Sequence, residues 1–293
     1  MNFQYGGQAL IEGVMMRGKK NLAMAVRKSN NDITCKIEQI ESIADKYPFL
    51  KWPFLRGSVA LIEALVIGIK ALTFSANESA ESEEEELTKG EMFFTVALAL
   101  GLGILLFFIT PAILAHLLKK YVSDPLWQNL IEGIIRISIF ILYVIGISVL
   151  KDIQRVFQYH GAEHKVIHTY EAGEELTVTN CQKYSTLHPR CGTSFLLIVM
   201  VISILVFSLL GVEVFWWRLI SRVILLPFIA GISYEFLKYA GKHTDKPIIK
   251  VLNWPGMMLQ KLTTREPDDS QIEVAIKALE RVIEKDNNQC ESV

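Results

Sequence analysis

The sequence predicts an α-helical polytopic membrane protein with about four transmembrane helices, one re-entrant or interfacial helix and a small cytoplasmic α+β part. Hydrophobic residues make up 51% of its 293 residues, and the mean hydropathy is +0.31. Several apolar stretches are long enough to cross a lipid bilayer, which is the partner we expect for them. The net charge of -1 gives no reason to expect a nucleic-acid partner.

Residues 1–52 are expected to form a cytoplasmic N-terminal segment that contains a β-hairpin. Residues 6–18 are rich in glycine, which suits tight turns or close approach to another element. Apolar residues alternate with polar or small ones over 22–26 and over 33–37, and the intervening 29–32 is Ser-Asn-Asn-Asp. Alternation on both sides of turn-forming residues predicts two paired strands.

Residues 53–76 are apolar over the length of a membrane crossing, yet they carry charged residues. Arg56, Glu63 and Lys70 are seven residues apart and therefore share one helix face. A charged stripe of this kind favours a helix that lies in the interface or dips in and out of the bilayer. Residues 77–91 are strongly acidic, which is typical of a solvated linker.

Four transmembrane helices are expected after the linker. Two fall within 92–150 and two within 194–240, at 92–118, 127–150, 194–214 and 217–240. Pro111 predicts a kink in the first of them. Glu132 and Arg136 in the second are i,i+4 partners, which face the bundle interior either as a structural pair or as part of a transport pathway.

Basic residues predict the orientation. Lysine and arginine gather in 1–52, in 151–193 and after residue 240, whereas the connection between the last two spans has almost none. Segments rich in these residues stay in the cytoplasm, and an even number of crossings places all three there. The prediction is a multi-pass protein of the plasma membrane with both termini in the cytoplasm, in which 53–76 does not cross.

Residues 241–293 are expected to form a cytoplasmic tail. Within it, 248–262 is typical of a short interfacial helix with Trp254 near the lipid headgroups. Ser270 and Glu273 have the spacing of a capping box, which predicts the start of an amphipathic helix. Its apolar stripe is Ile272, Ile276, Leu279 and Ile283. This helix would pack on the cytoplasmic part or dock a protein partner.

The residues capable of chemistry gather in 151–193, the His-rich loop between the second and third spans. His160, Glu163 and His164 have the spacing H-x-x-E-H. In a helix, the two histidines are one turn apart on the same face and can hold one ion. The prediction is a site for zinc or another divalent transition metal, with Glu163 as the general base that activates water.

Further candidate ligands lie close by. His168 continues the i,i+4 series, but along a helix it lies about 12 Å from His160, too far to share one ion. We expect His160 and His164 to bind with His188 or Cys191 as the third ligand, and His168 to lie outside the ligand set or face the substrate; the pair His164 and His168 is the alternative. Three residues near the end of the fourth span could also reach the site: Glu235, His243 and Asp245.

Four segments are typical of a known family and together extend over nearly the whole chain: 6–18, 160–165, 188–195 and 262–267. The first begins Gly-Gly-Gln-Ala and ends Met-Met-Arg-Gly, and the second is His-Gly-Ala-Glu-His-Lys. The third is His-Pro-Arg-Cys-Gly-Thr-Ser-Phe, and the fourth is Leu-Thr-Thr-Arg-Glu-Pro. In these segments the chain resembles the YqhQ-like family of membrane proteins. The resemblance implies a polytopic bacterial membrane protein with a metal centre, and it implies no substrate.

Three functions fit these patterns. The first is a metal-dependent hydrolase at the cytoplasmic face, in which Arg190 or Lys165 stabilises developing negative charge and the substrate is a peptide or a lipid-linked molecule. The second is a non-catalytic scaffold in which the same ligands close a structural zinc site and the protein serves a partner. The third is a transporter that uses Glu132 and Arg136, although no inverted repeat is evident.

Overall fold

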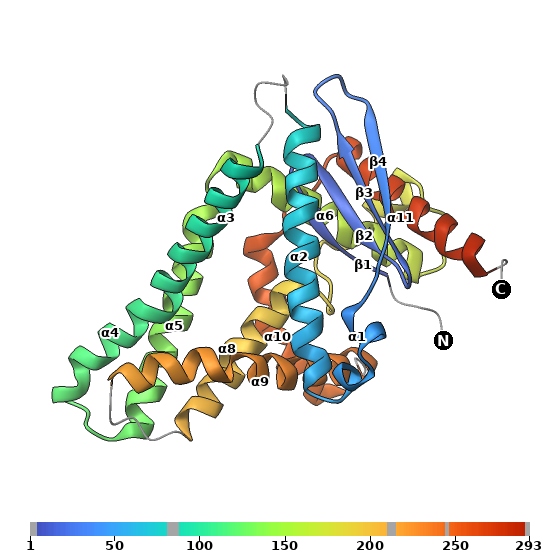
Figure 1. The fold of residues 1–293 in the computed structure, drawn as a ribbon. Coiled ribbons are helices and arrows are strands. Elements are labelled where there is room, and N and C mark those ends of the chain that lie inside the picture. Colours follow the sequence, from blue (N-terminus) through green and yellow to red (C-terminus); the bar gives the residue numbers. More distant parts are fainter. Residues whose placement is uncertain (1–4, 81–87, 210–214, 244–245, 291–293) are drawn as a thin grey trace.

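The computed structural model describes residues 5–80, 88–209, 215–243 and 246–290. Figure 1 shows a small β-sheet at the upper right and long helices that extend to the left and below it. The predicted fold class, a mostly helical membrane protein with a small α+β part, is confirmed.

The sheet has four antiparallel strands in chain order: β1 (Gly6–Leu10), β2 (Gly13–Arg17), β3 (Asn21–Arg27) and β4 (Ile33–Gln39). The predicted hairpin is confirmed as β3 and β4, which pair along their whole length. The glycine-rich segment ahead of it forms β1 and β2. The sequence did not predict these two strands because glycine is a poor strand former.

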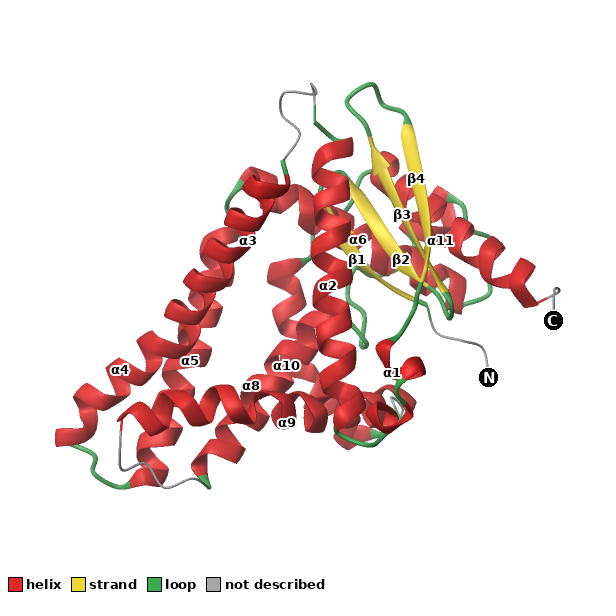
Figure 2. Cartoon of the chain, viewed as in Figure 1, coloured by secondary structure: helices red, strands yellow, loops and turns green. Residues whose placement is uncertain are grey.

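The helices, red in Figure 2, are α1 (Ile43–Lys46), α2 (Leu55–Glu78), α3 (Lys89–Ile104), α4 (Thr110–Leu117), α5 (Pro125–Ile147), α6 (Lys151–Glu171), α7 (Val178–Gln182), α8 (Gly192–Ser208), α9 (Phe215–Lys242), α10 (Pro247–Thr263) and α11 (Asp269–Cys290). Short 3₁₀ turns span Pro48–Lys51 and Leu118–Lys120. The predicted His-rich loop begins with the 21 residues of α6, so its first half is helical. Residues 81–87 of the predicted acidic linker lie outside the described residues.

Helices cover both faces of the sheet. On one face α6 and α11 pack over a buried core that includes Val14 and Met16. On the other face α2 buries Ala71 in a second core with Leu10 and Met15. Successive strand residues point to opposite faces, so the neighbours Met15 and Met16 belong to different cores.

Within the described residues, four helices are long and apolar enough to cross a membrane: Leu55–Ser79, Gly90–Lys120, Pro125–Ile147 and Ile220–Gly241. The number of candidate spans equals the number predicted, and the last three helices match predicted segments. The predicted span 194–214 corresponds instead to α8, a shorter apolar helix, and residues 210–214 lie outside the described part of the chain. By length and composition its place is taken by α2.

The charged stripe of α2 is matched by its surroundings. Each of its three residues has a partner: Arg56 pairs with Glu235 of α9 at 2.5 Å, Glu63 accepts a hydrogen bond from Ser42 at 2.8 Å, and Lys70 pairs with Glu38 of β4 at 2.7 Å. The first half of α2 therefore lies along an apolar helix and the second half along the sheet. This arrangement accounts for charges on a helix that is otherwise apolar.

The predicted kink near Pro111 is a π-helical turn, Leu105–Ile109, that joins α3 to α4. Pro111 has no N–H, so the carbonyl of Phe107 four residues earlier lacks its usual helical donor. Arg136 of α5 donates its Nε–H to this oxygen at 2.9 Å. The break in the first long helix is thus closed by a side chain from the second.

The predicted Glu132–Arg136 pair is present, with a hydrogen bond of 2.7 Å. Arg222 of α9 joins it and donates to both oxygens of Glu132, at 3.2 and 3.1 Å. Arg222 also lies 4.0 Å from the ring centroid of Phe207 in α8. All three charged residues are buried, so the cluster ties α5, α8 and α9 together.

Both helices predicted in the tail are present as α10 and α11, and the apolar stripe of α11 packs on the sheet and α6. The capping box assigned to Ser270 and Glu273 was wrong by two residues. Asp268 Oδ1 accepts the N–H of Gln271 at 3.0 Å, and Gln271 Oε1 accepts the N–H of Asp268 at 3.0 Å. Aspartate three residues before glutamine makes the same reciprocal pattern, and Ser270 donates to Asp268 instead.

Candidate metal centre

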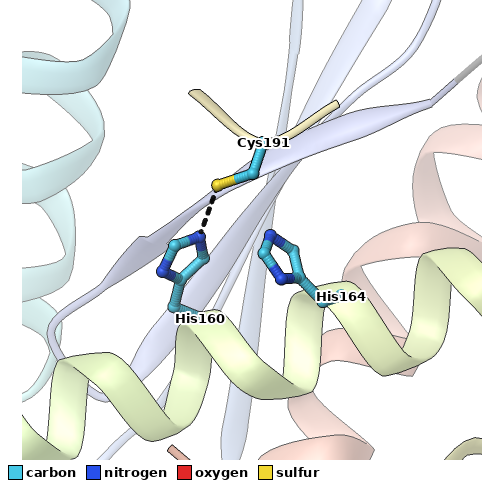
Figure 3. A group of neighbouring side chains, drawn as sticks. All are labelled: His160, His164 and Cys191. Atoms are coloured by element: carbon cyan, nitrogen blue, oxygen red, sulfur yellow. Dashed lines mark hydrogen bonds between the residues drawn. The ribbon is translucent and has the colours of Figure 1, made fainter. Parts of the chain in front are cut away.

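One face of α6 presents His160 and His164 to the segment that precedes α8, as Figure 3 shows. The two rings lie one turn apart, with centroids 4.4 Å from each other. Cys191 approaches them from the opposite side, and its Sγ lies 3.2 Å from Nε2 of His160. One ligand atom from each of the three residues lies within 4.8 Å of the other two. Three donors of the kinds that zinc prefers therefore lie close enough together to form a candidate metal site.

Backbone carbonyl groups orient both imidazole rings. The oxygen of Thr263 lies 2.8 Å from Nδ1 of His160, and the oxygen of Thr186 lies 2.5 Å from Nδ1 of His164. A carbonyl oxygen only accepts, so Nδ1 of each ring carries the proton and Nε2 keeps its lone pair. A carbonyl behind the distal nitrogen is the usual outer support of a metal-binding histidine.

Burial favours the neutral form of the His164 imidazole. The side chain is 2% exposed, and burial lowers the pKa of its imidazole. Metal ions bind the neutral ring, so a lowered pKa reduces competition from protons.

Cys191 stands at the N-cap of α8, where its Sγ accepts the N–H of Thr193 at 3.5 Å. A cysteine sulfur is a ligand that suits zinc. Gln260 of α10 holds the segment on both sides of the cysteine. It exchanges two hydrogen bonds with the backbone of His188, at 2.8 and 2.9 Å, and donates to Ser194 Oγ at 3.1 Å.

Glu163, the predicted general base, points from α6 toward β1. It is 5% exposed, and burial raises the pKa of its carboxyl group against the opposing influence of His160, His188 and the N–H of Gly7. A Cβ at Gly7 would lie 2.5 Å from the carbonyl oxygen of Met15 and 3.1 Å from Cδ of Glu163. Only glycine allows the strand to come this close to the carboxylate.

The other two predicted histidine ligands form a second group. The ring centroids of His168 and His188 are 4.5 Å apart, and Nε2 of His188 lies 3.5 Å from Oε2 of Glu171. One ligand atom from each of these three residues lies within 4.8 Å of the others. Glu171 was not among the predicted site residues, although its position three residues after His168 puts it on the same helix face.

The two predicted stabilisers of negative charge have different surroundings. Arg190 forms an ion pair with Glu171, burial lowers the pKa of its guanidinium, and it borders a cavity of about 470 Å³. Lys165 is buried and donates to the carbonyl oxygens of Gln182 and Tyr184, at 3.2 and 2.8 Å. Arg190 therefore lines a cavity while paired with Glu171, whereas Lys165 ties α6 to the following segment.

The cavity beside Arg190 lies on the face of the sheet that α2 covers. Its polar side includes Gln8 and Arg17, and its apolar side includes Leu61 of α2 and Leu237 of α9. Arg17 has no ion pair or side-chain hydrogen bond with any residue in the described part of the chain. An unpaired guanidinium near apolar walls suits a negatively charged molecule with an apolar portion.

Two of the candidates near the end of the fourth predicted span are not part of either group. Glu235 is paired with Arg56, and His243 stacks on Tyr239 with ring centroids 4.3 Å apart. Asp245 lies outside the described residues.

The four segments that carry the family resemblance meet at this centre. Residues 160–165 supply the histidines, and 188–195 supply the cysteine. Residues 262–267 supply the carbonyl oxygen behind His160, and 6–18 supply the N–H group that meets Glu163. Segments far apart in the sequence thus contribute different groups to one place.

The helices and this cluster define an integral membrane protein with a small α+β part and a His/Cys-rich centre. Residues 52–285 match the family model "Protein of unknown function (DUF1385)", so the chain belongs to this family. It is also 38% identical over 297 residues to the "Uncharacterized protein YqhQ" of Bacillus subtilis (strain 168), a match that covers 95% of this chain and 92% of that protein. The resemblance to the YqhQ-like family is confirmed. No solved structure matches the chain.

Proposed function

We propose that the protein is a membrane-embedded, metal-dependent hydrolase that holds zinc or another divalent transition metal with His160, His164 and Cys191. The observation that carries this proposal is the meeting of these three donors, two of them with rings held by backbone carbonyls. Among the described residues the group has three donors, which leaves a fourth tetrahedral position for water or substrate. Catalytic zinc sites keep such a position, whereas structural sites close it with a fourth protein ligand.

The surrounding residues fit hydrolysis. When bound, the ion would supply Lewis acidity and lower the pKa of water at the open position. Glu163 would accept the proton of the attacking water, since burial raises the pKa of its carboxyl group and makes it a stronger base. Arg190 and Arg17 would attract a negatively charged substrate and stabilise the charge that develops on it.

The cavity favours a lipid-linked substrate over a peptide. It combines Arg17 and Arg190 with apolar residues of α2 and α9, two helices long enough to cross a membrane. A molecule with a charged head and an apolar tail could reach such a cavity directly from the bilayer.

We propose a plasma-membrane location with both termini in the cytoplasm and α2 at the interface. Ile67, Ala71 and Phe74 of α2 pack against the sheet. A sheet with open edges needs water or protein at its backbone groups and does not fit in the hydrocarbon core. The second half of α2 would therefore stand outside the bilayer. Four crossings, by Gly90–Lys120, Pro125–Ile147, the shorter apolar helix α8 and Ile220–Gly241, would then place all the basic segments on the cytoplasmic side.

A scaffold with a structural zinc site is the second candidate, and the cysteine ligand favours it. However, side chains of α6 already donate hydrogen bonds to carbonyl oxygens along 182–187, so this segment has other anchors besides an ion. The transporter is not favoured, because the carboxylate of Glu132 is held by two arginines.

The test is metal binding by full-length protein, purified in detergent through a tag without histidine. Elemental analysis should find bound transition metal that is lost in the double variant His160→Ala/Cys191→Ala and retained in the control His243→Ala. The proposal fails if the wild type holds no metal or if the double variant holds as much as the wild type.

The open position can be tested separately on the cobalt(II) form. Azide should shift the visible bands of a hydrolase, because an open position admits an added ligand, and Glu163→Gln should retain the metal. Bands that do not respond to azide would support the closed site of a scaffold.

A further inference from the structure

We propose that His168, Glu171 and His188 form a second cation site beside the first, so that the protein binds two divalent metal ions. This inference rests on the proposed function, because it adds an ion next to the proposed hydrolytic centre.

Four residues of α6 that can bind a metal lie along one face of the helix. Positions 160, 164, 168 and 171 follow one another at intervals of four, four and three residues, which keeps them on one side. The imidazoles form a continuous row with His188, with centroid distances of 4.4 Å from His160 to His164, 5.6 Å from His164 to His188 and 4.5 Å from His188 to His168. Metal–nitrogen bonds are only about 2 Å long, so one ion cannot serve the whole row.

The donors divide into two sets of three that share no member. The sequence left open whether His188 or Cys191 is the third ligand, and the structure places these two residues in different sets. Cys191 lies with His160 and His164, whereas His188 lies with His168 and Glu171. Both residues can therefore be ligands, each to its own ion.

His188 supplies an independent indication of a missing partner. Its side chain is 4% exposed, and its buried Nε2 has no hydrogen-bond partner among the described residues. A buried polar atom without a partner is unfavourable, and coordination to a cation would supply the missing partner. Nδ1 accepts the N–H of Arg190 at 3.3 Å, a long bond that would be lost when the proton moves from Nε2 to Nδ1.

His168 and Glu171 each have an atom available to bind a metal ion. Nε2 of His168 donates to the carbonyl oxygen of Leu187 at 3.0 Å, so Nδ1 keeps its lone pair. Glu171 uses Oε1 for its ion pair with Arg190, and its other oxygen, Oε2, faces His188. Glu171 is partly exposed, which gives an ion a path to the site.

The two sites differ in donor chemistry. The first includes a thiolate and suits zinc, whereas the second offers two nitrogens and one carboxylate, which also suit manganese, iron or cobalt. Two neighbouring cations recur in enzymes that cleave phosphate esters and peptides, where they stabilise charge on both sides of the bond that breaks. Two cations, together with Arg17 and Arg190 in the lining of the cavity that Gly192 also borders, favour a strongly anionic substrate.

Cobalt(II) distinguishes the two sites, since only the first should show cobalt–thiolate charge-transfer absorption. Full-length protein is purified without a histidine tag, stripped with a chelator, reloaded with cobalt(II) and desalted. We expect two ions per chain in the wild type and one in Glu171→Gln and in His168→Gln, both with the thiolate band intact. Cys191→Ser should also keep one ion but lose the band, and the control His243→Gln should keep two.

The results separate this inference from the proposed function. One ion per chain with a thiolate band, unchanged in Glu171→Gln and His168→Gln, would refute the second site and leave the proposed hydrolase intact. Two ions retained in both variants would also refute it. No bound ion in the wild type would refute both proposals. Thermal unfolding of each variant checks that the loss of an ion is not a loss of folding.

Discussion

A methyl group at Gly161 tests whether the centre depends on the close approach of α6 to the chain that follows α10. An ideal Cβ there would overlap the carbonyl oxygen of Arg265 and lie 3.1 Å from Cγ2 of Thr186. Carbon and oxygen need about 3.3 Å, so the two segments would have to separate by roughly 1 Å. Overpacking of this kind costs about 1–3 kcal/mol, and the better helix propensity of alanine returns about 1 kcal/mol. We expect Gly161→Ala to lose about 1 kcal/mol of stability.

The larger effect should fall on metal binding. The overlap lies next to the two carbonyl groups that orient the ligand rings, those of Thr263 and Thr186. Loss of outer support typically lowers metal affinity 10- to 100-fold, or about 1.4–2.7 kcal/mol. The expected loss of affinity therefore exceeds the loss of stability.

Chelator competition measures the affinity, and thermal unfolding in detergent measures the stability. Gly146→Ala in α5 is the matched control, because a Cβ at that position meets nothing within 4 Å. An affinity equal to that of the wild type would show that the contact between α6 and residues 263–265 does not hold the ligands, and the reasoning would be refuted.

Two further predictions concern stability. Asp268→Ala should cost about 1 kcal/mol of stability at neutral pH, because α11 loses its N-terminal cap. Burial raises the pKa of the Asp268 carboxyl group, but its hydrogen bonds outweigh burial, so the folded pKa lies below the unfolded value of 3.8. The stabilisation is therefore present above pH 3.8 and is lost as the pH falls through the folded pKa. An unfolding temperature equal to that of the wild type at pH 7 would contradict this. Burial lowers the pKa of three histidines in the folded protein: His164, His168 and His188. Below about pH 6.5 the unfolded chain therefore binds protons that the folded chain does not, and the stability of the chelated protein should fall. Unfolding temperatures between pH 7.5 and 5 check this, and a rise toward pH 5 would refute it.

Much of the fold could be predicted because the period of apolar residues and the length of apolar stretches identify helices in the sequence. The stripe of α11 and three of the apolar spans depend on local sequence, and each is present where the pattern places it. The strands β1 and β2 depend instead on pairing with β3, since their own glycines disfavour extended structure. The first half of α2 packs along α9 and the second half along the sheet, and this arrangement likewise depends on which elements lie beside α2.

At the candidate metal centre, too, the local sequence predicts some residues and not others. The spacing of His160 and His164 identifies one helix face without knowledge of the fold. His188 and Cys191 are only three residues apart, and their separation into different groups follows from the turn held by Gln260, which comes from another helix. The sequence did not identify Arg17 as a cavity residue, because its orientation follows from a strand that the sequence did not predict.

The position of the three donors explains why an ion would matter to the whole molecule. His160 and His164 belong to α6, whose neighbours include the sheet and α11. Cys191 caps α8, which packs against α5, α9 and α10. An ion bound by all three would therefore join the α+β part to the apolar helices. Because Gly7 and Gly161 bring two more segments within contact of the same helix, a change in any of the four family segments should alter one shared site. Mutations in the first and the last of these segments, hundreds of residues apart, should then be non-additive in metal affinity, as expected for groups that support one set of ligands.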